Sequence, residues 1–233
     1  MREITRRNCV KNREKFIIDK CNDKRVLHLG CCDAPYTNFK FGNDKSLFQR
    51  IEKVAESQKG LDIDNDGLEY ISSLGHDVSF FDLNNPEKID FNPEIIIFAD
   101  TLEHLMNLQI CLSSLKGLMN ENVELIITVP NATMFERFFG NFKGHIQEHP
   151  DHKISFTYSA LKQLLIFNDL AISGIFVSDQ LHLDKNIVEK TDKTYFKDIL
   201  LSPFRASKFV LRKILVTLFP LFSECLIVVC KTK

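Results

Sequence analysis

A glycine and three aspartates end short apolar runs of the chain, and these residues are the first candidates for chemistry. The runs RVLHLG, KGLDID, DVSFFD and EIIIFAD bring Gly30, Asp62, Asp82 and Asp100 to or near their ends, and a fifth run, ELIITVPN, closes at Asn131. Each run has the length of a strand, and most neighbours are separated by a helix-length segment. Such alternation predicts parallel strands, whose carboxyl ends share the edge where open α/β sheets bind ligands. We therefore expect these polar ends to meet in one crevice.

The first turn argues against a dinucleotide as the ligand of this crevice. The segment GCCDAP after the first run holds one glycine, whereas a pyrophosphate needs three glycines there to approach the backbone. Asp62 follows Gly30 by thirty-two positions, and the dinucleotide fingerprint places its acid about 20 positions on. A nucleoside ligand without a pyrophosphate, such as S-adenosylmethionine (SAM), remains, because a carboxylate can accept hydrogen bonds from both ribose hydroxyls.

Taken in order, the runs resemble the motifs of class I SAM-dependent methyltransferases. VLHLGCCDA is similar to their V-L-D-L-G-C-G-x-G motif, ADTLEHL to their D-x-x-E-H-L signature, and GLDID, DVSFFDL and ITVPNA to the ends of their second, third and fifth strands. HPDHKISFTYSALKQLL also resembles a segment of bacterial members associated with surface-glycan biosynthesis. The resemblance implies a Rossmann-like α/β fold, with a mostly parallel seven-stranded sheet, an antiparallel terminal strand and helices on both faces.

The resemblance also implies a SAM site at the strand ends. Its members would be Gly30 and Cys31 at the methionine moiety, Asp62 and Ile63 at the ribose and adenine, Asp82 and Leu83 at the adenine amine and ring, Asp100 and Thr101 beneath the sulfonium, and His28 behind the first loop. His28 replaces an acid that orients this loop in the family, and we expect its ring N–H to substitute. Cys32 and Ala34 replace glycines. These departures support an alternative, a degenerate SAM- or nucleotide-binding module without catalysis.

Histidines are the candidates for the general base that a hydroxyl acceptor needs. They are His104, after the fourth run, and His145, His149 and His152, after the fifth. The resemblance favours His149, with His104 as the second candidate. The alternative is that His104 packs on its helix and that the others are exposed loop residues. The main prediction is a methyltransferase that acts on a small-molecule or glycan acceptor, at a hydroxyl oxygen.

A metal site is the alternative use of the same residues, although we expect no metal ion. On a helix over residues 101–119, Asp100, Glu103 and His104 would share one face, and a histidine such as His149 would complete a set for Mg²⁺ or Mn²⁺. This pattern resembles the metal site of small-RNA 2′-O-methyltransferases, which makes such an enzyme a further alternative.

Composition favours a single-domain cytoplasmic protein. The chain has 233 residues, 44% of them hydrophobic, and its net charge of −1 argues against a nucleic-acid partner. Its seven cysteines form no C-x-x-C pair, which favours a reduced protein without a disulfide or zinc framework. Residues 1–15 are charged and lack the apolar core of a signal peptide. The acceptor and the oligomeric state are left open.

The remaining segments are expected to surround the sheet within one domain, residues 1–233. Residues 1–23 read as a helical lead-in, and residues 132–155 and 179–222 as acceptor-side or lid additions. Helices are expected over residues 46–57, 67–74, 101–119 and 156–170, and strands over 171–178 and 224–231. The Phe-rich residues 134–144 form either a mobile lid or a packed helix. The amphipathic helix 205–219 packs on the domain or rests on a membrane surface.

Overall fold

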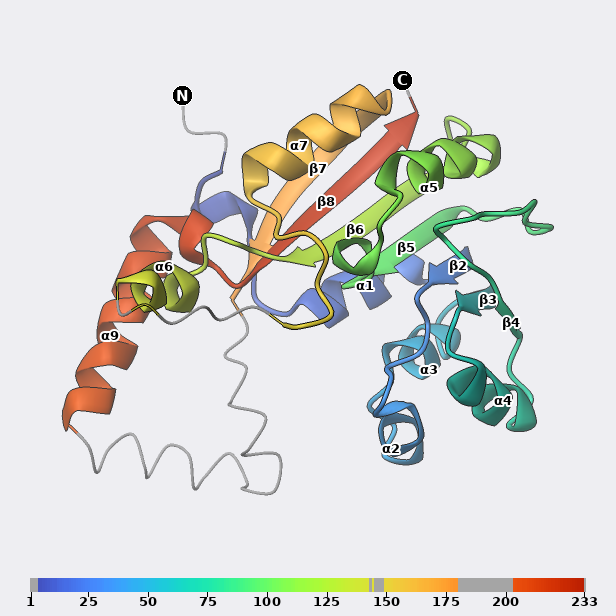
Figure 1. Ribbon diagram of the computed structural model, residues 1–233, viewed down its shortest axis with the longest axis horizontal. Helices are drawn as coiled ribbons and strands as arrows, with labels where there is room; N and C mark the ends of the chain where they lie inside the picture. Colours follow the sequence, from blue (N-terminus) through green and yellow to red (C-terminus); the bar gives the residue numbers. More distant parts are fainter. Residues whose placement is uncertain (1–3, 143, 145–148, 180–202, 233) are drawn as a thin grey trace.

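A single eight-stranded sheet organises the protein (Figure 1). The computed structural model describes residues 4–142, 144, 149–179 and 203–232. The strands lie in the order β1-β7-β8-β6-β5-β2-β3-β4. Their bounds are β1 (Cys9–Val10), β2 (Arg25–Leu29), β3 (Ser57–Asp62), β4 (Val78–Phe80), β5 (Ile95–Ala99), β6 (Glu124–Pro130), β7 (Leu170–Ser178) and β8 (Cys225–Thr232).

Strand directions match the mostly parallel sheet expected from the sequence. β8 runs antiparallel to both neighbours, β6 and β7, and the other strand pairings are parallel. The antiparallel C-terminal strand is therefore confirmed. The predicted number of seven strands is wrong, because two residues of the lead-in, Cys9 and Val10, form β1 against the end of β7.

Helices cover both faces of the sheet, which explains why its central strands are almost entirely apolar. The α-helices are α1 (Arg13–Cys21), α2 (Thr37–Gly42), α3 (Leu47–Glu52), α4 (Asn65–Ser73), α5 (Leu108–Leu115), α6 (Phe135–Asn141), α7 (Tyr158–Phe167) and α9 (Pro203–Leu218). Leu27 and Leu29 of β2 pack in the cluster that includes α5 and α7, whereas Val26 packs with α1 and α3 (Figure 1).

The predicted helix over residues 101–119 is broken in the structure. A short 3-10 helix, Leu102–His104, is followed by an extended break before α5, and a second 3-10 turn, Lys116–Leu118, ends the segment. Asp100 has a φ of +52°, so the chain turns sharply before any helix begins. Asp100, Glu103 and His104 therefore do not form the face of one α-helix.

Other helix predictions were closer. The expected lead-in helix shortens to α1, whose first turn is capped by Asn12, since Lys15 N donates to Asn12 Oδ1 at 2.8 Å. The helix expected over residues 156–170 forms as α7, which Thr157 caps by accepting from Ala160 N at 3.2 Å. The helix expected over residues 67–74 begins two residues earlier, as α4, and its N-cap position belongs to Asp64.

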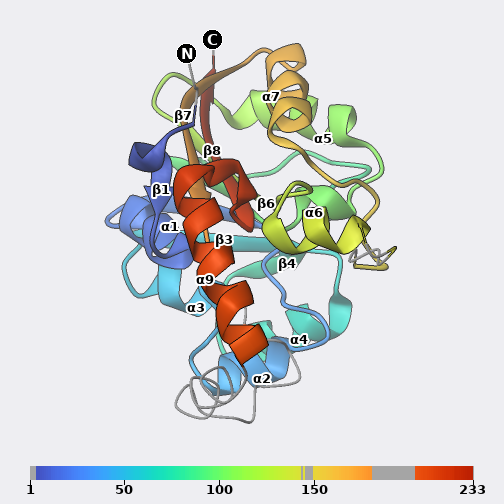
Figure 2. The same cartoon turned by 90° about the vertical axis from the view of Figure 1, so that its left-hand side faces the viewer.

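Two later helices lie beside each other at the end of the sheet where β6 and β7 finish. They are α6 and α9 (Figure 2). Arg212 of α9 joins them: its Nε donates to Glu136 Oε1 of α6 at 2.6 Å, and its two terminal nitrogens each donate to Asp179 at 2.7 Å. The Phe-rich segment forms the helix α6, in which Phe138 packs edge-on against Phe222 at 5.4 Å, and a lid role for it stays a prediction.

The amphipathic helix α9 lies in an orientation that the sequence did not predict. Arg212, from its polar stripe, is only 7% exposed, whereas Val210, Leu211, Ile214 and Leu218 are 54%, 48%, 50% and 47% exposed. Arg212 therefore takes part in the contact with the domain, whereas Lys213 and Thr217 are exposed. Membrane contact through this helix stays a prediction. No helix in the described residues is both long and apolar enough to cross a bilayer.

Candidate functional site

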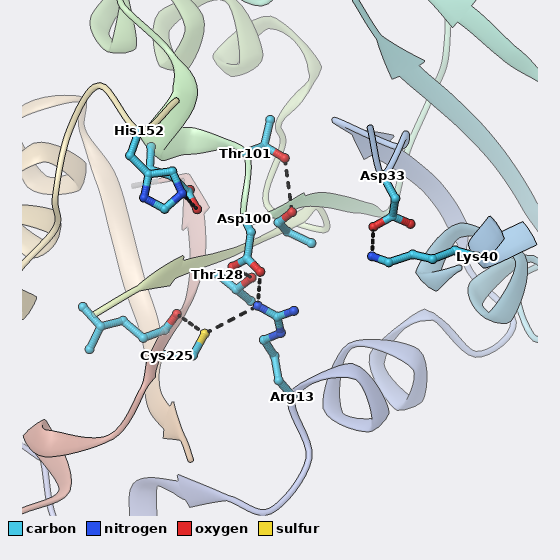
Figure 3. Close-up of polar contacts among 11 residues, drawn as sticks. Arg13, Asp33, Lys40, Asp100, Thr101, Thr128, His152 and Cys225 are labelled. Carbon is cyan, nitrogen blue, oxygen red and sulfur yellow. Dashed lines mark hydrogen bonds and ion pairs between the residues drawn. The ribbon is translucent and has the colours of Figure 1, made fainter. Parts of the chain in front are cut away.

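Gly30 brings the first turn into close contact with the turn after β5. Its φ of +71° lies in the region that favours glycine, and a Cβ there would stand 2.2 Å from Thr101 Oγ1. The Thr101 hydroxyl lies 3.2 Å from the carbonyl oxygen of Leu29, to which it donates (Figure 3). The two turns expected at the methionine and sulfonium of SAM are therefore adjacent.

Asp62 fixes the first loop through its carboxylate. Oδ2 accepts from Cys32 N at 2.8 Å, and Oδ1 accepts from Ile63 N at 2.7 Å and from Asp64 N at 3.0 Å. Burial raises the pKa of Asp62, against the opposing effect of these backbone hydrogen bonds. A carboxylate offers about four acceptor positions, so about one remains for a ribose hydroxyl. Ile63, expected on the adenine, is 57% exposed.

Asp82 and Leu83 lead into a turn that joins the β4 end to the α5 segment. Asp82 Oδ1 accepts from Asn84 N at 2.8 Å, while the Leu83 side chain is buried in the core. Asn84 Oδ1 in turn accepts from Met106 N at 2.8 Å and from Asn107 N at 3.2 Å. Sequence analysis missed Asn84, although the D-x-N spacing is typical of such side-chain-capped turns.

His28 lies in the core rather than in the crevice. It is 2% exposed and stacks on Phe48 at 6.0 Å, and its Nδ1 has no hydrogen-bond partner in the described part of the chain. Burial lowers its pKa to about 4, so the ring is neutral at pH 7. A role for His28 in orienting the first loop stays a prediction.

Asn131 also departs from the expected convergence of polar strand ends. It is fully buried, and its Nδ2 donates to the carbonyl oxygens of Leu221 at 2.6 Å and Ser223 at 2.8 Å. Its Oδ1 accepts from Thr133 N at 3.0 Å. Asn131 therefore anchors the segment that leads into β8 and does not face a ligand crevice.

Asp100 is held by an arginine that sequence analysis missed. Arg13, the first residue of α1, extends from below the sheet edge and donates through Nη1 to Asp100 Oδ2 (Figure 3). The same nitrogen lies 3.9 Å from Cys225 Sγ, and Thr128 Oγ1 donates to Asp100 Oδ1 at 3.3 Å. Arg13 thus neutralises the carboxylate expected beneath the sulfonium. Its place in a charged lead-in gave no signal of this contact.

A small pocket opens beside this ion pair. Its volume is about 160 Å³, and its lining comes from Arg13, Asp100, Pro130, Met134, Arg137, Ser178, Glu224 and Cys225. Burial, and then the charge of Asp179, raise the pKa of Glu224 to about 7. The pocket combines both charge signs with apolar walls from α6, β6 and β8, so it can take a small polar group.

Three histidines, His104, His149 and His152, and Glu103 lie close together in the segments after β5 and β6. The His104 ring lies 4.8 Å from that of His152 and 6.4 Å from that of His149. Burial, and then the charge of Asp100, raise the pKa of Glu103 to about 8, while burial, and then His152, lower the pKa of His104. His145, the fourth candidate base, lies outside the described residues.

The potential metal ligands differ from the set predicted from the sequence. Glu103, His104 and His152 bring one ligand atom each to within 4.8 Å of one another. Asp100 and His149, the other predicted members, do not belong to this group, because Arg13 holds Asp100 and because the partly exposed His149 accepts from Asp151 N through Nδ1.

No protein-family model matches the chain, and no curated protein matches it. Its fold does match solved structures. Magnesium protoporphyrin IX methyltransferase (ChlM) from Synechocystis PCC 6803 with bound SAH gives a TM-score of 0.58 at 11% identity, over 94% of this chain and 82% of that one. A SAM-dependent methyltransferase from Clostridium acetobutylicum gives 0.57 at 12% identity, over 94% and 90%. One from Archaeoglobus fulgidus gives 0.53 at 16% identity, over 94% of each chain. The chain therefore has the Rossmann-like fold of SAM-dependent methyltransferases.

Proposed function

We propose that the protein is a SAM-dependent methyltransferase that acts on a small molecule, at a hydroxyl oxygen. The observation that carries this proposal is the division of one sheet edge into two adjoining parts. Gly30, Asp62 and Asp82 lie at the ends of β2, β3 and β4, and the pocket beside Asp100 lies at the ends of β5, β6 and β7. Ligands of open α/β sheets bind along this edge, so a cofactor and an acceptor would meet at Asp100 and Thr101.

The size of the pocket favours a small acceptor group. At about 160 Å³ it is smaller than the roughly 300–1,000 Å³ of sites that enclose drug-sized ligands, so it suits one ring or a short polar chain. The net charge of −1 does not favour an RNA acceptor. A glycan acceptor rests on the sequence resemblance alone and stays a prediction.

In this function SAM would supply a methyl group on a positively charged sulfur, and the protein would supply alignment and a base. The turn at Gly30 and Thr101 would position the cofactor tail. Burial lowers the pKa of His104, so its imidazole is neutral at pH 7 and could accept the proton of the acceptor hydroxyl. The His149 ring lies 6.4 Å from the His104 ring, and its side chain is 47% exposed. His149 can therefore exchange a proton with solvent, as a general base must.

Calorimetric titration with SAM tests the cofactor site. Asp62→Asn should weaken SAM binding by about 10- to 100-fold, because a charge-assisted hydrogen bond to the ribose is lost. Asp77→Asn is the matched control: Asp77 precedes β4, at the opposite edge of the sheet, and pairs with Lys59 on the surface. Equal affinity of the two variants, or no SAM binding by the unmodified chain, would refute the site.

Transfer of labelled methyl groups from SAM to fractionated small-molecule extracts tests catalysis. The alternative of a degenerate SAM-binding module gains support from Cys32 and Ala34 in the first loop and from the burial of His28. A chain that binds SAM but labels no acceptor would favour that module. Labelling that His104→Ala and His149→Ala leave unchanged would exclude these histidines as the base.

A further inference from the structure

Glu103 has an unusual environment for a carboxylate. Its side chain is 1% exposed, and neither Oε1 nor Oε2 has a hydrogen-bond partner within the described residues. Burial of a charged carboxylate without donors is costly, and buried carboxylates are normally paired or bound to metal ions. Among the described residues, the basic side chain within 4.0 Å of this carboxylate is an imidazole: His152 Nε2 lies 3.9 Å from Glu103 Oε1. The charges of Arg13 and Arg137 also act on the carboxylate, but neither arginine donates a hydrogen bond to it.

The surrounding backbone builds this contact. Lys153 N and Ile154 N, directly after His152, both donate to the carbonyl oxygen of Glu103, at 2.8 and 3.2 Å. These hydrogen bonds fasten the loop that precedes α7 to the 3-10 turn after β5. His104 lies on that turn, so two imidazoles and a carboxylate from segments almost fifty residues apart are held together.

His104 is oriented as a metal-binding histidine commonly is. Its Nδ1 lies 3.3 Å from the carbonyl oxygen of Asp151. Donation from Nδ1 to this oxygen leaves the lone pair on Nε2, and metal-bound histidines regularly make such a contact with their second nitrogen. His149 differs, because its Nδ1 accepts from Asp151 N at 3.3 Å and its side chain is 47% exposed.

We propose that Glu103, His104 and His152 form a binding site for a divalent first-row transition metal ion. One carboxylate and two imidazoles favour ions such as Zn²⁺, Co²⁺ or Mn²⁺ over Mg²⁺, which prefers oxygen ligands. The three ligand atoms lie within 4.8 Å of one another. Metal–ligand bonds of about 2.0–2.2 Å bring such atoms to about 3.5 Å apart, so small side-chain rotations would close the site.

Three protein ligands leave further coordination positions for water or a ligand oxygen. Glu103 lies three residues after Asp100 in the chain, and the two carboxylates interact electrostatically, so the ion would lie near the acceptor half of the edge. If the proposed function holds, a bound ion would lower the pKa of an acceptor hydroxyl there, and His149 would take its proton, because His104 would be a metal ligand. The binding site itself does not depend on methyl transfer.

A second cluster must be distinguished from this site. Cys31, Cys32 and Asp62 also bring ligand atoms within 4.8 Å, but the Asp62 oxygens already accept three backbone hydrogen bonds. Co²⁺ separates the two clusters, because thiolate ligation adds strong near-ultraviolet charge-transfer absorption and oxygen and nitrogen ligation does not.

The experiment is a titration of the full chain with Co²⁺, followed by competition with Zn²⁺. We expect one Co²⁺ per chain, with visible ligand-field bands and no thiolate band. Glu103→Gln, His104→Ala and His152→Ala should each weaken binding by at least about tenfold, since even residues outside the first coordination sphere contribute that much. His149→Ala is the matched control and should bind as the unmodified chain does.

Other outcomes would overturn the site. They are no stoichiometric binding, equal affinity in Glu103→Gln and the unmodified chain, or a thiolate band that Cys32→Ser removes. Glu103→Gln keeps the side-chain shape, and its circular dichroism and thermal midpoint without metal show whether a loss of affinity reflects misfolding. A chain that binds Co²⁺ but not SAM would refute the proposed function and leave the metal site standing.

Discussion

Gly30→Ala should destabilise the protein because of two separable effects. The first is backbone strain: at a φ of +71° an L-residue costs about 1–2 kcal/mol. The second is a collision. The new Cβ would lie 2.2 Å from Thr101 Oγ1, 2.5 Å from its Cγ2 and 2.9 Å from its Cβ, whereas ordinary contacts are 3.4–4 Å. Rotation of the threonine side chain cannot move its Cβ, so the turn itself must shift.

Gly75→Ala isolates the strain from the collision. Gly75 has a φ of +90°, and an added Cβ there meets no atom within 4 Å. It should therefore cost about 1–2 kcal/mol. Overpacking adds about 1–3 kcal/mol, so Gly30→Ala should reach about 2–5 kcal/mol. Thr101→Ala removes the two closest atoms, so the double variant Gly30→Ala/Thr101→Ala should lose less stability than the sum of its single changes.

Urea unfolding followed by circular dichroism measures these differences, provided that the slope with denaturant is unchanged. SAM calorimetry on the folded variants would add a functional measure, since Gly30→Ala displaces the turn expected at the cofactor and Gly75→Ala does not. The reasoning fails if Gly30→Ala is no more destabilising than Gly75→Ala, or if Thr101→Ala gives no relief.

Two further predictions concern the pocket. Arg13→Ala removes the ion-pair partner of Asp100 and leaves its carboxylate, among the described residues, only the hydrogen bond from Thr128; because the Arg13 and Asp100 side chains are 13% and 35% exposed, this should cost about 1–3 kcal/mol. Lys15→Ala, which breaks an ion pair with Asp19 whose side chains are 71% and 59% exposed, should cost about 0.5 kcal/mol or less. Equal urea midpoints of the two variants would contradict this. The pKa of Glu224, ordinarily 4.5, is raised to about 7 in the folded chain, so the folded state keeps a proton that the unfolded state releases, and stability should fall as pH rises from 4.5 to 7. Glu224→Gln removes this effect, so its stability relative to the unmodified chain should rise across that window; parallel stability curves would refute the assignment.

The fold was largely predictable because its signals are local. Continuous apolar runs between helix-length segments specify strands buried on both faces, and β2 to β6 formed within a few residues of their expected bounds. β1 was not predictable, because Cys9 and Val10 are strand residues only through their pairing with the end of β7. The helix expected over residues 101–119 failed for a similar reason: Asn84, from the neighbouring turn, accepts from the amides of Met106 and Asn107 and holds the break open.

The sequence by itself determined the strand order along the chain and the residues at the strand ends, since hydrophobic periodicity and turn residues act over short distances. Only the tertiary structure decided what those residues touch. Asp62 proved to hold the first loop, Asp100 to be neutralised by Arg13, and Asn131 to be buried. The tertiary structure also places His152, and not His149, beside Glu103 and His104 as a potential metal ligand. The physical reason is that contacts between segments distant in sequence depend on how the elements pack, which no local pattern encodes.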